Sequence, residues 1–128
     1  MTTTARPDLT AHQTAMRAEF KDVAAQLREI LGAKLVAYLG GVGETRAVRQ
    51  WAEGERTPSD AVQARLRLAY QVAATIAAND SAKIAQVWMQ GLNPQLDDRS
   101  PARILRDGDP DEVGADVIGA MRAFLVGG

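Results

Sequence analysis

Residues 35–59 read LVAYLGGVGETRAVRQWAEGERTPS, and they decide how the chain is organised. The glycine-rich stretch GGVG divides them into two short segments. The first belongs to the apolar run AKLVAYLGG, which ends in a pair of glycines. The second segment, ETRAVRQWAEG, has a spacing that gives a helix two distinct faces. The apolar face comprises Val48, Trp51 and Ala52, and the opposite face carries Arg46, Arg49 and Gln50. We therefore expect two short helices joined by a tight turn, the second with a basic outer face.

Two short helices in this arrangement are typical of a helix-turn-helix, whose second helix enters the major groove of DNA. Arginine, threonine and glutamine side chains on that helix contact phosphates and base edges. The candidate DNA-binding residues are Thr45, Arg46, Arg49, Gln50 and Arg56. The alternative interpretation of the same charges is a solvated helix face without a ligand.

The remaining periodicity is also helical, so the predicted fold class is all-α, with a helix-turn-helix in the N-terminal part. A first amphipathic helix ends at Gly32, and its apolar stripe is Met16, Phe20, Val23, Leu27 and Leu31. A longer helix begins at Ser59 or Asp60 and ends at residues 78–80. Its inward residues are Val62, Leu66, Ala69, Ala73 and Ile76.

The last third of the chain contains two strong helix-start signals. Ser100 is a predicted N-cap, Pro101 occupies the first helical position, and Gly108 lies just past the end. Asp109 and Pro110 begin a final helix that runs to about Val126. Its inward stripe is Val113, Val117, Met121 and Phe124. We divide the chain into residues 1–32, an N-terminal helix; 33–79, the helix-turn-helix and long core helix; and 80–128, a helical C-terminal region.

Composition excludes several classes of protein. The 128 residues have a net charge of -1 and include no cysteine, which rules out disulfides and thiolate metal sites. The start, MTTTARPDLT, lacks the apolar run of a signal peptide, and no stretch is apolar enough to span a membrane. We expect a cytoplasmic protein without membrane association. A net charge near zero means that any contact with nucleic acid must be local.

Neither a metal nor a cofactor is expected. His12 is the only histidine and has no cysteine or second histidine with which to share a metal. Asp107, Asp109 and Asp111 imitate the first ligands of a calcium loop, but Glu112 and Ile118 occupy the positions that need glycine and glutamate. No set of nucleophile, base and orienting residue is recognisable, so we expect no enzymatic activity.

By its residues, the segment 35–59 resembles the Xre, or phage-repressor-like, helix-turn-helix family. The landmarks are Val48, Trp51, Glu53, Gly54 and Pro58. The resemblance implies that Trp51 fills the core, that Gly54 terminates the recognition helix and that Arg56 faces the DNA backbone. Since a lone tryptophan on an apolar helix face is usually buried, we expect both Trp51 and Trp88 in the core.

The C-terminal part is similar to the toxin-binding region of the Xre/MbcA/ParS antitoxins. The landmarks are Trp88, Asn93, Pro94, Leu96, Pro101, Ile104, Leu105 and Gly108. This resemblance implies that the partner is a RES-domain toxin that consumes NAD. It also implies that the C-terminal end of the antitoxin covers the toxin's active site while the helix-turn-helix binds the operator.

These observations together predict an antitoxin that neutralises a RES-domain toxin and represses its own operon. The expected toxin-binding residues are Arg103, Arg106, Asp107, Leu125, Val126, Gly127 and Gly128. Arg103 and Arg106 are expected to form a polar rim around an apolar plug made by the last four residues. Residues 28–67 carry seven cationic and five acidic side chains, an excess of only +2. Tight operator binding therefore requires two paired half-sites, supplied by a homodimer of the chain or by a larger complex with the toxin. The alternative is a stand-alone transcriptional regulator whose C-terminal region dimerises.

Overall fold

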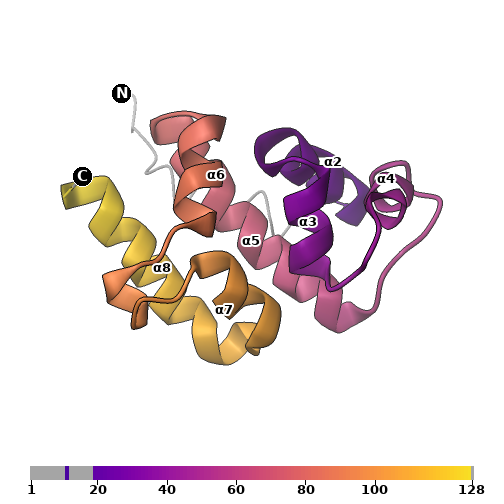
Figure 1. Cartoon of the computed structure of the whole chain (residues 1–128). Helices are drawn as coiled ribbons and strands as arrows, with labels where there is room; N and C mark the ends of the chain where they lie inside the picture. The colour runs from indigo at the N-terminus through magenta and orange to yellow at the C-terminus, as the bar shows by residue number, and fades with distance from the viewer. Residues whose placement is uncertain (1–10, 12–18, 128) are drawn as a thin grey trace, which may run out of the picture.

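The computed structural model describes residues 11 and 19–127, and its named elements in these ranges are all helices (Figure 1). The predicted all-α fold class is confirmed. Met16 and His12 lie outside the described residues. The helices are α2 (Phe20–Leu31), α3 (Ala33–Gly40), α4 (Thr45–Ala52), α5 (Asp60–Asn79), α6 (Ala82–Gln90), the 3-10 helix η1 (Pro94–Leu96), α7 (Pro101–Asp107) and α8 (Pro110–Gly127).

Side-chain caps start the helices where the sequence predicted them. The hydroxyl of Ser59 accepts the backbone N–H of Val62 at 3.3 Å, and that of Ser100 accepts the N–H of Arg103 at 3.2 Å. The Asp109 carboxylate accepts the N–H of Asp111 at 2.8 Å. Each cap satisfies a donor that has no partner inside its own helix, which fixes the first turn.

Helix α5 is the central element of the fold. It is 20 residues long, and Figure 1 shows it running diagonally through the molecule from the α4 side to the α6 side. Its buried residues are Leu66, Ala69, Tyr70, Val72, Ala73, Thr75 and Ile76. Since these residues occur on several sides of the helix, α5 packs against both the N-terminal and the C-terminal helices. One hydrophobic core therefore runs through all three predicted segments.

Polar contacts attach α2 to this centre. The Tyr70 hydroxyl donates to the Gln26 side-chain carbonyl at 2.6 Å, and the Gln86 amide donates to the carbonyl of Ile30 at 2.8 Å. Burial raises the pKa of Tyr70 above its ordinary value of 10.0, so the phenol remains a neutral donor at physiological pH. These bonds join α2 to α5 and α6.

The contact between α3 and α4 depends on a glycine. A Cβ atom built at Gly40 would lie 2.7 Å from Cη2 of Trp51, which is closer than carbon atoms approach. The indole ring therefore lies directly on the backbone of α3. Phe20 also packs against the indole, with its ring centroid 6.4 Å from that of Trp51 in an edge-on arrangement. Trp51 is 2% exposed, which confirms its predicted place in the core.

The C-terminal helices form a second packed layer. Trp88 of α6 is 8% exposed, as predicted for a core residue, and its ring lies 6.2 Å from that of Phe124 in α8. The inward stripe of α8 differs in detail from the prediction. Val117 and Met121 are buried, but Val113 and Phe124 are only half-buried, and the small residues Gly114 and Ala120 are buried beside them. Gly114 faces Leu68 of α5, and a Cβ built there would meet the Leu68 side chain at an ordinary contact distance of 3.5 Å.

None of the described helices is both long enough and apolar enough to cross a lipid bilayer.

Replacing Gly40 by alanine should destabilise the fold by roughly 1 to 3 kcal/mol, because the added methyl group overlaps the Trp51 ring. The matched control is Gly43→Ala, where a Cβ meets nothing within 4 Å, and the expected effect is neutral or slightly stabilising. Urea unfolding followed by circular dichroism measures both. Equal midpoints for the two variants would show that the tryptophan does not depend on a bare backbone at position 40.

Candidate nucleic-acid interface

The outward face of α4 presents four of the five residues predicted to bind DNA. Thr45 and Arg46 are exposed in its first turn, and Arg49 and Gln50 are half-buried one turn later. Arg56 is exposed in the connection to α5. Arg46, Gln50 and Arg56 line a common hollow, together with Val42, Gly43, Glu44 and Ala47. The structure therefore brings these three polar side chains to one surface.

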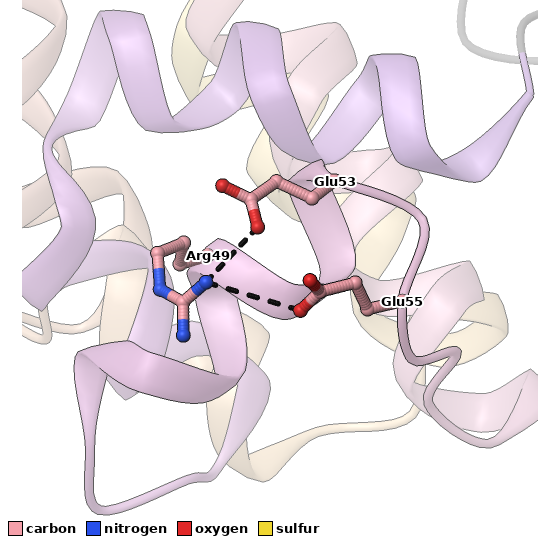
Figure 2. Close-up of polar contacts among 3 residues, drawn as sticks. All are labelled: Arg49, Glu53 and Glu55. Carbon is pink, nitrogen blue, oxygen red and sulfur yellow. Dashed lines mark hydrogen bonds and ion pairs between the residues drawn. The ribbon is translucent and has the colours of Figure 1, made fainter.

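Arg49 differs from the other arginines of this face because it is held by two carboxylates. Its Nη1 lies 2.9 Å from Oε1 of Glu53 and 3.8 Å from Oε2 of Glu55, as Figure 2 shows. The three side chains are between 43% and 55% exposed. Two glutamates thus offset the charge of an arginine that was predicted from the sequence to contact DNA.

The turn after α4 explains this arrangement. Gly54 has a φ of 75°, a left-handed conformation that glycine adopts without strain, and the chain reverses there. The N–H groups of Glu55 and Arg56 both donate to the carbonyl of Gln50, at 2.9 and 3.3 Å. Consequently Glu55 returns beside Arg49, while Arg56 is placed next to Gln50 in the hollow.

A second hollow adjoins the first and is shared between α3, α4 and α7. Its lining includes Lys34, Tyr38, Thr45, Arg46 and Arg106. The Arg106 Cζ atom lies 4.5 Å from the centroid of the Tyr38 ring, the geometry of a cation–π contact. Arg106 was expected beside the last four residues, so its position against α3 corrects that expectation.

Arg103 and Asp107 lie on a different side of α7. Arg103 Nε is 3.7 Å from Asp107 Oδ2, and both side chains are well exposed. They line a hollow between η1, α7 and α8 that also includes Asp97, Arg99 and Asp116. With three carboxylates and two arginines, this group of side chains has a net charge of -1.

The last turn of α8 is distant from these arginines. α8 has 18 residues and is therefore about 27 Å long, and α7 lies at its beginning (Figure 1). The predicted rim of Arg103 and Arg106 around the plug is not formed, because α8 carries residues 125–127 away from α7. Leu125 is half-buried against the core, Val126 is 90% exposed and Gly127 is exposed. Gly128 lies outside the described residues.

Lys34 and Tyr38 line the second hollow but were not among the candidate residues predicted from the sequence. They are four residues apart in α3 and therefore share one face of that helix. This spacing was a usable signal for a basic and aromatic pair. The position of Arg106 in this hollow had no such signal in the sequence, since it depends on how α7 packs against α3.

Among residues 11 and 19–127, no three histidine, aspartate or glutamate side chains are grouped so that they could hold a metal ion. No family model, curated protein or solved structure matches this chain.

Replacing Glu53 and Glu55 together by glutamine should strengthen binding to a nonspecific DNA duplex at low salt. The change frees Arg49 for a phosphate contact, so the slope of log K against log salt should steepen by about 0.9. Stability should change by less than about 1 kcal/mol, since exposed ion pairs contribute little.

The charge-matched control is Asp80→Asn with Asp116→Asn, two exposed carboxylates, one directly after the end of α5 and one in α8. Fluorescence anisotropy across a salt series measures both proteins. Equal slopes for the two double variants would mean that Arg49 does not face the duplex.

Proposed function

We propose that this chain is an antitoxin that represses its own operon through α3 and α4 and neutralises a RES-domain toxin through its C-terminal helices. The two halves of this proposal rest on different grounds. Geometry supports DNA binding, whereas the landmarks in the sequence support the toxin partner.

The observation that carries DNA binding is the common hollow of Arg46, Gln50 and Arg56 on the outer side of a short helix–turn–helix unit. Arginines supply contacts to phosphate, and the Gln50 amide suits the paired donor and acceptor of an adenine edge. Thr45, exposed at the start of α4, is placed to reach phosphate or a base. Buried Trp51 fixes α4 from behind, so the polar side chains are presented by a rigid support.

The electrostatics favour a homodimer on the operator. The ion pairs of Arg49 reduce an already small positive excess, so one protomer binds a duplex weakly. Two copies on adjacent half-sites add their contacts, which is the usual solution for helix-turn-helix proteins.

The toxin-binding half rests on the resemblance to antitoxins and on the surface of the C-terminal helices. The large apolar side chains exposed there are Val87, Leu92 and Val126. Val126 projects from the last turn of α8, where a side chain can enter a partner's pocket. Leu125 is packed inward, which leaves Val126 as the apolar contact we assign to the toxin.

The alternative function is a stand-alone regulator whose C-terminal helices dimerise. The neighbouring reading frame separates the two functions. A neighbour that encodes a RES domain supports the antitoxin, and a neighbour of another kind favours the lone regulator.

Arg46→Ala and Arg56→Ala should each lower the slope of log K against log salt by about 0.9 on the duplex from upstream of the coding region. Arg49→Ala should have a smaller effect, because Glu53 and Glu55 already engage this arginine. Gln50→Ala should leave the slope unchanged but reduce the preference over a scrambled duplex. An unchanged slope in the Arg46 and Arg56 double variant would contradict DNA binding by α4 and favour the interpretation of these charges as a solvated helix face without a ligand.

Val126→Asp should release the RES-domain protein encoded by the neighbouring frame and restore its NAD consumption in a purified mixture. A carboxylate without a partner is costly in an apolar contact, so binding should weaken at least about tenfold. Ala115→Asp, exposed earlier in the same helix, is the control and should still inhibit. Full inhibition by the Val126 variant would show that the toxin docks elsewhere.

A further inference from the structure

We propose that Arg106 of α7 is a phosphate-binding residue of the DNA interface and that Tyr38 holds it in position. This inference rests on the proposed DNA binding and extends the interface beyond the helix-turn-helix. It assigns a residue of the C-terminal segment to the surface formed by α3 and α4.

Arg106 lies on the same surface as the side chains of α3 and α4. α7 packs against α3, and Arg106 lines the hollow that also contains Lys34, Thr45 and Arg46. Figure 1 shows α7 beside the end of α3 from which the chain leaves for α4. The two hollows share Val42, Gly43, Glu44 and Arg46. They therefore form a continuous strip from Arg56 to Arg106, and an extended polyanion such as a DNA backbone suits a strip better than a single small anion does.

The charge of this surface also favours an anion. The hollow around Arg106 is lined by three cationic side chains, Lys34, Arg46 and Arg106, and by one carboxylate, Glu44. Arginine keeps its charge at any pH at which the fold persists. Positive charge is therefore in excess at this part of the surface, and phosphate oxygens would balance it.

The side chain of Arg106 is preorganised for such a contact. The guanidinium of Arg106 lies over the Tyr38 ring, which restricts an otherwise flexible side chain while leaving its N–H groups available at the edges. Arg103 provides the contrast within the same helix, because its guanidinium pairs with Asp107 and lies near Asp97 and Asp116. One arginine of α7 is thus neutralised locally, and the other is poised for an external anion.

The test compares Arg106→Gln with Arg103→Gln on the full chain, with anisotropy on the upstream duplex and on a scrambled duplex of equal length. Loss of one phosphate contact should lower the slope of log K against log salt by about 0.9, or roughly eightfold in affinity at 0.1 M salt. Arg106→Gln should show this loss equally on both duplexes, since phosphate contacts carry no sequence information. Arg103→Gln should match the unmodified protein.

Two variants of Tyr38 test the role of the ring. Tyr38→Phe keeps the aromatic face and should retain the slope, whereas Tyr38→Leu removes it and should lower affinity in the same direction as Arg106→Gln. Thermal unfolding of each variant identifies any loss of affinity that comes from a destabilised fold. Lys34→Gln removes another cation of the same hollow while leaving Tyr38 and Arg106 intact, and it should also lower the slope of log K against log salt by about 0.9.

The outcomes separate this inference from the proposed function. If Arg106→Gln binds like Arg103→Gln while Arg46→Ala loses affinity, the inference is overturned and DNA binding through α4 stands. If the unmodified protein binds neither duplex at low salt, the proposed DNA binding itself is wrong. If Arg106→Gln lowers the slope of log K against log salt and Arg103→Gln does not, the inference is supported.

Discussion

The packing of the Trp51 indole on the bare backbone of Gly40 is the constraint on which the proposed interface depends. It sets the separation of α3 and α4, and with it the direction in which the polar side chains of α4 point. The Trp51 Nε1 atom is buried without a hydrogen-bond partner in the described part of the chain, which costs about 1 to 3 kcal/mol. Truncation of a buried tryptophan to alanine typically costs about 3 to 5 kcal/mol, so the packing of the ring outweighs the unmade bond.

Much of the helical framework could be predicted from the sequence because it depends on neighbours along the chain. Ser59, Ser100 and Asp109 cap their helices by bonds to residues two or three positions ahead. Gly32, with a φ of 86°, ends α2 as the sequence indicated. Spacing also identified the buried side of α4, since Val48 and Trp51 are three positions apart and share a face.

The arrangement of the charged side chains was harder to predict, because it depends on how helices pack against one another. Periodicity states which face of α7 is buried, but not which helix covers that face. Arg103 and Arg106 are three residues apart, yet one faces the aspartates near η1 and the other faces Tyr38. The pairing of Arg49 with Glu55 likewise required the reversal at Gly54, which returns the chain to α4.

The continuous core along α5 bears on how such a chain can evolve. A recombination event that exchanged the segment before Asp60 would present new side chains to residues of α5 that are also shaped by α6 and α8. A transplanted N-terminal segment must therefore have a compatible buried surface, or acquire one by compensating substitutions. Under the proposed DNA binding, new specificities should arise more readily by changes at Thr45, an exposed position of α4, because such changes leave that surface untouched.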